Sequence, residues 1–332
     1  MLDVVIVKLE ELDDFDDLSR LKQAFGPDSL GIIIVKHQDP HIASLRNIVL
    51  LNASKLANLP PTKLSQLECP EAFWLVGWSR GRERLKNGEY DFNKGSFYAN
   101  CAFHVNPQYE CPPPEMCLGD YSQFKAYTTR NIWPSDNTIK LFEKDFKELC
   151  NYILNVAGKV ARICDQYMTQ IVEDFQPGFL ERIVKESTTT KARMLHYYPI
   201  AGTSGIQDDW CGEHLDHSCL TGLLPASYVD GGGEIVSDTS PDNEGGLYIR
   251  NRKGELVKVD IPSDCIAFQT GSALEEITRG RFKAVPHYVK GVLVEGIARN
   301  TLAVFCQPNL HELVNDTQDF AQYAQMILEK HH

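Results

Sequence analysis

The second half of the chain is dominated by short segments rich in β-branched and aromatic residues. From about residue 190 they recur at nearly regular intervals, separated by Gly, Pro, Asn and Asp. The segments are ARMLHYYP, HLDHSCLTGLL, GGLYIRN, ELVKVDIP, CIAFQTG, KAVPHYV and NTLAVFCQP. Many short strands punctuated by turn residues favour an antiparallel barrel or jelly roll. We therefore expect a mixed α+β protein with such a core.

One long helix is predicted in front of these strands. Apolar residues recur there with spacings of four and three, which places them in one continuous stripe. They are Phe142, Phe146, Leu149, Ile153, Val156, Val160, Ile163 and Tyr167. Residues 135–137 (SDN) offer N-caps. A stripe of this kind is typical of a helix packed against a core. Two further helices, FLERIVKES and DFAQYAQMILEKHH, are expected against the outside of the barrel.

In the first part of the chain, predicted strands alternate with predicted helices. VVIV (4–7) and LGIIIVKH (30–37) are predicted strands, DDFDDLSRLKQAF is a predicted helix, and another helix is expected after Pro40. The Pro-, Gly- and aromatic-rich stretch 60–135 is predicted to be mostly loop.

These patterns divide the chain into two regions. Residues 1–135 form an N-terminal region of strands, helices and loops, and residues 136–332 hold the long helix, the barrel and the C-terminal helix. We expect the two to form one compact unit. The Gly- and Asp-rich patch 230–246 is predicted to be a mobile loop inserted between strands.

Composition excludes several classes of function. The 332 residues carry a net charge of −12 without a basic block, which argues against nucleic acid as a partner. Ten cysteines without a CxxC pair indicate reduced thiols rather than disulfides or a zinc ribbon. The N-terminus lacks the pattern of a signal peptide, and no apolar run reaches the roughly 18 residues of a membrane span. We expect a cytoplasmic protein, with a monomer favoured.

The segment HLDH brings metal-ligand chemistry into a strand. Residues two apart face the same way, so His214 and Asp216 share a face and His217 points to the opposite one. A further histidine, His287, lies 71 residues after Asp216. Two histidines and a carboxylate are the facial triad of non-haem Fe(II) oxygenases, which leaves three coordination positions open. The alternative is a hydrogen-bonded core histidine beside a surface aspartate.

Two other strands carry polar residues that fit a carboxylate. Arg299 and Thr301 share a strand face, and an inward-pointing arginine is costly unless an anion neutralises it. A guanidinium beside a hydroxyl suits bidentate carboxylate binding. In RMLHYYP, His196 and Tyr198 also alternate onto one face, where the phenol could complete the carboxylate site. The alternative for Arg299 is a structural salt bridge.

Together these residues resemble the isopenicillin N synthase-like branch of the 2-oxoglutarate/Fe(II)-dependent dioxygenases. LGIIIVKH looks like the family's GFF-x-hydrophobic-x-NHG strand, and DFNKGSFYAN is similar to its substrate-side loop. RMLHYYP is similar to R-x-N-YYP and EHLDHSCLTGLL to HTDxxxLTLL. The longest match is GSALEEITRGRFKAVPHYV, which resembles GDxLExxTNGRxKSxxHRV. The resemblance covers most of the chain and implies a double-stranded β-helix (jelly-roll) core with flanking helices.

The resemblance also implies a site and an activity. It assigns Fe(II) to His214, Asp216 and His287, and the distal carboxylate of 2-oxoglutarate to Arg299, Thr301 and Tyr198. The implied reaction uses O2 to oxidise a C–H bond of an unidentified small molecule, with succinate and CO2 as co-products. The chain departs from the family in three respects: Thr301 replaces a serine, His196 replaces the asparagine of NYYP, and the stretch between the HxD motif and the second histidine is longer.

Other functions stay open at this point. In isopenicillin N synthase itself the equivalent arginine holds a substrate carboxylate and no 2-oxoglutarate is used, so Arg299 predicts a bound carboxylate without identifying it. A non-catalytic binding protein on the same fold is an alternative of another class. A zinc hydrolase using the same ligands would lack an HExxH-type base. Four residues are candidates for the substrate pocket, although aromatic residues at such places often serve packing: Phe97, Tyr98, His196 and Tyr228.

Overall fold

The computed structural model describes residues 4–84, 88–116, 121–200 and 209–331. Its strands form two sheets. The large sheet has the order β1-β2-β12-β7-β14-β5-β4-β3, with β8 pairing β14 and β9 pairing β8. The small sheet has the order β11-β10-β13-β6. All pairs are antiparallel except the parallel pair β1–β2.

The strands of the large sheet are β1 (Val5–Lys8), β2 (Ile32–Lys36), β3 (Gly77–Arg80), β4 (Lys94–Asn100), β5 (Lys191–Tyr197), β7 (Leu220–Leu223), β8 (Ser227–Val229), β9 (Ile235–Ser237), β12 (Cys265–Thr270) and β14 (Ala298–Cys306). Those of the small sheet are β6 (Asp209–His214), β10 (Gly246–Arg250), β11 (Leu256–Val259) and β13 (His287–Lys290). The helices are α1 (Leu18–Phe25), α2 (Pro40–Ala57), α3 (Pro61–Leu64), α4 (Lys125–Thr128), α5 (Phe142–Ile171), α6 (Phe179–Glu186), α7 (Ser272–Ile277) and α8 (Phe320–His331). Short 3-10 turns lie at Leu9–Leu12, Ser65–Leu67, Pro70–Ala72, Ala102–His104, Pro114–Met116 and Tyr121–Gln123.

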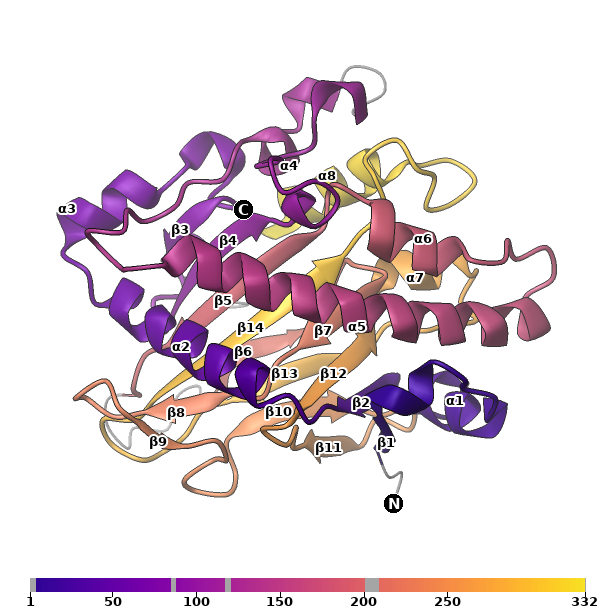
Figure 1. Cartoon of the computed structure of the whole chain (residues 1–332), viewed down its shortest axis with the longest axis horizontal. Coiled ribbons are helices and arrows are strands. Elements are labelled where there is room, and N and C mark those ends of the chain that lie inside the picture. The colour runs from indigo at the N-terminus through magenta and orange to yellow at the C-terminus, as the bar shows by residue number, and fades with distance from the viewer. Residues whose placement is uncertain (1–3, 85–87, 117–120, 201–208, 332) are drawn as a thin grey trace.

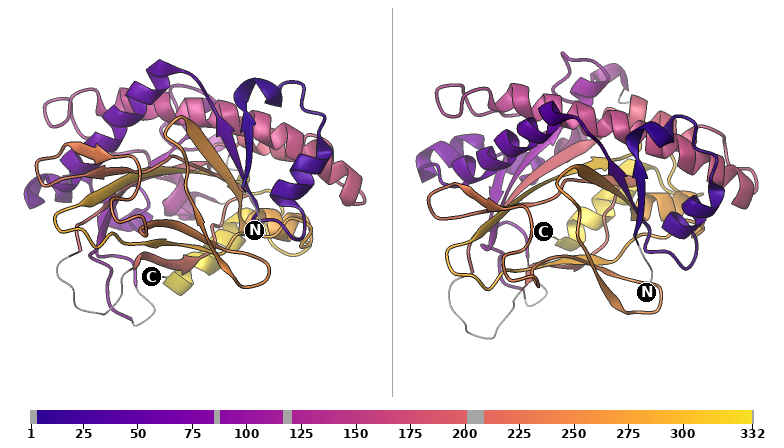
Figure 2. Two further views of the ribbon diagram at one scale, coloured as in Figure 1. Left: turned by 90° about the horizontal axis from the view of Figure 1, so that it is seen from below. Right: turned by 60° about the horizontal axis from the view of Figure 1, so that its bottom comes forward.

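The molecule is layered. Helices α5 and α2 lie across one face of the large sheet (Figure 1). The small sheet lies on the side of the large sheet away from these helices (Figure 2). The large sheet therefore has a packing face toward the helices and an inner face toward the small sheet.

The long helix α5 confirms the predicted apolar stripe. All eight stripe residues are buried, and they join one core cluster with residues of the large sheet. The helix begins at Phe142, later than the predicted caps at 135–137. Asp136 instead accepts a hydrogen bond from the Leu141 amide, and Leu141 has a left-handed backbone (φ 58°), so the preceding residues form turns rather than helix.

The prediction that residues 60–135 are mostly loop missed two strands. β4 is buried along its whole length and pairs with β3 on one side and β5 on the other. The sequence KGSFYAN was therefore wrongly assigned to a loop. Its glycine and asparagine obscured the strand pattern, whereas pairing on both sides makes a fully buried strand stable.

Strands from both regions of the chain build the large sheet. β2 is inserted between β1 and β12, while β3 and β4 extend the edge beyond β5. The nine described cysteines are free thiols, as predicted, and Cys117 lies outside the described residues. Within the described ranges no helix is both long and apolar enough to cross a bilayer.

Candidate metal and carboxylate site

A cavity of about 110 Å³ lies between the two sheets. Its wall includes residues of β5, β7 and β14 from the large sheet and of β6, β10 and β13 from the small sheet. His214, Asp216, His287, Arg299 and Thr301 all line this cavity. The structure therefore brings together the three predicted metal ligands and two of the three predicted carboxylate ligands.

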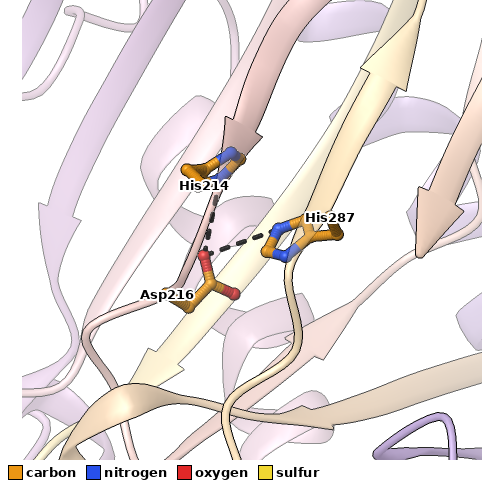
Figure 3. A group of neighbouring side chains, drawn as sticks. All are labelled: His214, Asp216 and His287. Atoms are coloured by element: carbon orange, nitrogen blue, oxygen red, sulfur yellow. Dashed lines mark ion pairs between the residues drawn. The ribbon is translucent and has the colours of Figure 1, made fainter. Parts of the chain in front are cut away.

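The three predicted metal ligands converge (Figure 3). His214 ends β6 and lies opposite His287, the first residue of β13, with ring centroids 4.3 Å apart. The Oδ1 atom of Asp216 lies 3.7 Å from the Nε2 atom of each histidine. One ligand atom from each of the three residues lies within 4.8 Å of the others, a spacing that a single metal ion can bridge. His217 is not a member of this group. The predicted strand does not extend to it, because β6 ends at His214 and both Asp216 and His217 follow the strand.

Neighbouring groups orient each of these ligands. The Nδ1 atom of His214 is 2.8 Å from the Gly212 carbonyl, and that of His287 is 2.8 Å from the Val285 carbonyl. A proton on Nδ1 donated to each carbonyl leaves both Nε2 lone pairs for a metal. The side-chain amide of Gln269 donates to Oδ2 of Asp216 at 2.7 Å, which leaves Oδ1 directed at the histidines.

The charge states of these ligands follow from burial and from neighbouring groups. Burial alone would lower the pKa of His214, but Cys211 and Asp216 raise it to about 9, so this imidazole loses a proton when a metal binds. Burial lowers the pKa of His287, and the adjacent His214 lowers it further, which favours the neutral, metal-binding form. Burial alone would raise the pKa of Asp216, but the two histidines hold it below its ordinary value, so the carboxylate is ionised. This donor set of two imidazoles and one carboxylate fits a non-haem Fe(II) ion.

Arg299 is the second notable feature of the cavity. The residue is 6% exposed, and its Nε and Nη1 atoms are buried without a hydrogen-bond partner in the described part of the chain. Its guanidinium lies 5.2 Å from the ring centroid of Tyr197 and forms no salt bridge among the described residues. The predicted alternative of a structural salt bridge is therefore wrong. A buried, unpaired guanidinium fits an anionic ligand such as the distal carboxylate of 2-oxoglutarate.

Thr301 lies beside Arg299 on the same face of β14, as predicted. Its hydroxyl donates to the Leu224 carbonyl at 3.0 Å. The hydroxyl proton is thus already used, and binding a carboxylate through it would require the hydroxyl to rotate.

The prediction for Tyr198 and His196 placed them on the wrong face of the large sheet. The Tyr198 hydroxyl donates to the Ala57 carbonyl of α2 at 3.1 Å, and His196 hydrogen-bonds Asn300 at 2.7 Å. These two rings do pack on each other, but neither lines the cavity. Tyr197 lines it instead, directly opposite Arg299 in the pairing of β5 with β14. The register was one residue off, and a shift of one exchanges the two faces of a strand.

The other candidate pocket residues divide between the two faces of the large sheet. Tyr228 lines the cavity and pairs with Arg299 across β8 and β14. Phe97 packs against Phe142 and Phe146 of α5, so its role is in the core. Tyr98 faces the inner side but does not reach the cavity, because it donates to Glu83 at 3.2 Å.

The inserted segment 230–246 forms part of the cavity wall. It contains β9, and its residues Asp238, Thr239 and Ser240 line the cavity. Asp238 binds the guanidinium of Arg46, a residue of α2 that is 3% exposed. The segment is therefore not loop throughout, because β9 pairs with β8 and Asp238 pairs with the buried guanidinium of Arg46.

Sequence patterns missed several cavity residues. Gln269 is a polar residue in the apolar strand CIAFQTG, and that contrast was the available signal. Arg193 also lines the cavity, and it belongs to a group of buried charged side chains that the sequence did not reveal. Ion pairs between distant segments, here from Glu83 to Arg193, leave no local pattern.

Solved structures similar in fold include 2-oxoglutarate/Fe(II) oxygenases. A putative 2OG-Fe(II) oxygenase family protein from Caulobacter crescentus superposes with a TM-score of 0.71 at 20% identity, covering 98% of this chain and 99% of that one. JOX2 in complex with 2OG, Fe and JA gives a TM-score of 0.66 at 17% identity, covering 98% of this chain and 85% of that one. A Neurospora crassa protein in complex with alpha-KG and thymine gives 0.64 at 18% identity, covering 93% and 86%. The chain thus has the fold of the 2-oxoglutarate/Fe(II) oxygenases.

No family model matches the sequence, and no curated protein matches it either. The likeness therefore lies in the fold, while the function of this chain has to be argued from its own residues.

Proposed function

We propose that this protein is a non-haem Fe(II)- and 2-oxoglutarate-dependent oxygenase that oxidises a C–H bond of a small molecule. In this proposal the two sheets are the halves of a double-stranded β-helix, and His214, Asp216 and His287 hold the iron. The observation that carries the proposal is the unpaired guanidinium of Arg299, which opens into the same cavity as the metal ligands.

Each residue has a physical task in this reaction. The two imidazoles and the Asp216 carboxylate bind the metal, while Gln269 fixes the free oxygen of that carboxylate. Arg299 neutralises the distal carboxylate of 2-oxoglutarate and so sets the orientation of its 2-oxo acid end. The apolar side chains of Leu195, Leu223 and Val289 line the cavity and exclude water from it. Bound iron would supply oxidation by O2, with succinate and CO2 as co-products.

The solved neighbours support this choice of chemistry. The complexes of the Neurospora crassa protein and of JOX2 contain alpha-KG or 2OG, together with thymine or JA. By analogy the substrate of this protein is a small molecule, and no membrane or nucleic-acid partner is required. We further propose that the protein acts as a monomer in the cytoplasm.

A second candidate function follows from the same arginine. If Arg299 binds the carboxylate of the substrate itself, the protein is an Fe(II) oxidase of the isopenicillin N synthase type without 2-oxoglutarate. A non-catalytic binding protein on this fold is the third candidate. It would bind iron at the triad without any turnover of 2-oxoglutarate.

One experiment separates these candidates. The purified protein is loaded anaerobically with Fe(II), exposed to O2 with 2-oxoglutarate, and assayed for succinate, alongside Arg299→Ala and an iron titration. The proposal expects slow succinate formation by the wild type without substrate and its loss in the variant, with iron binding retained in both. Iron binding without any binding of 2-oxoglutarate would overturn it.

A further inference from the structure

The charged residues that line the cavity differ in how they are neutralised. Besides the metal ligands they are Arg193, Asp238, Asp260 and Arg299. Arg193 pairs with Glu83, Asp238 pairs with Arg46, and Asp260 pairs with Lys258. Of these four residues, only Arg299 has no oppositely charged partner within the described ranges. The cavity therefore offers one unpaired cation for one carboxylate.

The side chain of Arg193 is already bound by other residues of the chain. Its Nη2 atom binds Glu83, and its Nε and Nη2 atoms lie 3.0 and 2.8 Å from the Ser96 hydroxyl. Glu83 also lies 3.0 Å from the ammonium group of Lys94, which is in turn 2.9 Å from Asp91. Glu83, Asp91, Lys94 and Arg193, here called the Arg193 cluster, thus contain two cations and two carboxylates.

This balance has a consequence for a ligand that reaches Arg193. An anionic group finds no free cation there, because Arg193 and Lys94 already have carboxylate partners, and binding Arg193 would require it to displace Glu83. An uncharged group meets no such barrier, because the cluster is already neutral. Arg193 lines the cavity and Glu83 does not. Glu83 is 29% exposed and comes from the loop after β3, so it binds Arg193 from a separate segment of chain.

We propose that the Arg193 cluster restricts the prime substrate to molecules that carry no negative charge, with Glu83 as the residue that excludes carboxylates. This inference rests on the proposed function, in which 2-oxoglutarate occupies Arg299. The substrate is then an uncharged small molecule, and cavity-lining residues such as Leu195, Leu223 and Val289 offer it apolar contacts.

The test uses benzoate as an anionic probe and benzamide as its uncharged counterpart. The protein is loaded with Mn(II), saturated with 2-oxoglutarate without O2, and titrated with each probe while the paramagnetic relaxation of the probe protons is measured. Wild type should give no relaxation of benzoate. Glu83→Gln, which leaves Arg193 and Lys94 in excess, should bind benzoate at least about tenfold more tightly than wild type does.

A matched control removes the same charge elsewhere. Glu68→Gln breaks the exposed ion pair with Arg82, and it should leave benzoate excluded. If Glu83→Gln does not fold, Glu83→Asp withdraws the carboxylate by one methylene and should admit benzoate more weakly. Benzoate bound near the metal in wild type saturated with 2-oxoglutarate would overturn the inference, and so would its exclusion from a folded Glu83→Gln protein.

Failure of the proposed function gives a different result. If wild type does not bind 2-oxoglutarate, benzoate has access to Arg299 and should bind once, with loss of binding in Arg299→Gln. Glu83→Gln should then bind two equivalents of benzoate. One equivalent in both proteins would refute the role of Glu83 independently of the co-substrate.

Discussion

The cavity has a metal end, formed by His214, Asp216 and His287, and an Arg299 end. The two differ in whether their polar groups already have partners within the protein. At the metal end every ligand is already oriented, since backbone carbonyls fix both imidazoles and Gln269 fixes the carboxylate. At the Arg299 end a buried cation is left without a partner among the described residues. The metal ligands are already oriented to hold an ion in one geometry. The buried guanidinium of Arg299, in contrast, is neutralised only when an anion binds. The difference predicts that substitutions at the two ends will affect different ligands.

The largest effect is expected at the metal end. His214→Ala, Asp216→Ala or His287→Ala should each abolish Fe(II) binding and leave the fold intact, because these side chains face a cavity rather than a packed layer. Anaerobic iron titration with circular dichroism measures both properties. His217→Ala is the matched control and should bind iron normally. Iron loading that depended on His217 and not on His214 would refute the site.

At the other end, Arg299→Ala should impair 2-oxoglutarate binding alone. Removing the partner of a buried carboxylate costs about 2–5 kcal/mol, which corresponds to a loss of affinity of at least about thirtyfold. Calorimetric titration of the Mn(II)-loaded protein with 2-oxoglutarate measures this loss, and the metal affinity should not change. Arg279→Ala, which removes an exposed arginine, serves as control. A parallel loss of metal affinity would show that the two ends are not independent.

A smaller effect is expected when the support of the metal end is removed. Gln269→Leu deletes the hydrogen bond to Asp216 and frees the carboxylate to rotate, so metal affinity should fall about tenfold. The readout is competition of Mn(II) with a calibrated chelator. Gln307→Leu removes another buried glutamine, which bonds the Thr189 carbonyl, and should leave metal affinity unchanged. Equal losses in both variants would indicate general destabilisation instead.

The smallest effect concerns the two adjacent tyrosines. Tyr197→Phe removes the hydroxyl of the side chain next to Arg299 on the neighbouring strand β5, and should weaken 2-oxoglutarate binding by about 1 kcal/mol, the usual value of one hydrogen bond. Tyr198→Phe removes a hydroxyl that bonds α2 and should lower thermal stability without changing this affinity. Loss of 2-oxoglutarate affinity in Tyr198→Phe but not in Tyr197→Phe would instead support the sequence prediction that Tyr198 faces the cavity.

Sequence patterns reached the metal end more accurately than the Arg299 end. The HxD spacing is a local sequence pattern, and His214, Asp216 and His287 do converge, although Asp216 lies beyond the end of β6. The long helix was predictable for the same reason, since its stripe follows one period. The face of β5 that points into the cavity was not predictable. Alternation shows that His196 and Tyr198 share a face, but it does not show which face lines the cavity. Gln269 and Glu83 act through contacts between distant segments, which no local pattern encodes.

The position of β14 also constrains how the chain can fold. This strand lies between β5 and β7 in the large sheet, yet it is the last strand along the described chain. During synthesis the N-terminal strands emerge first, and the two halves of the sheet have no common partner until Ala298–Cys306 has been made. Pairings of such high sequence separation make folding slow. Nascent chains that stop before Ala298 should therefore stay protease-sensitive and depend on chaperones.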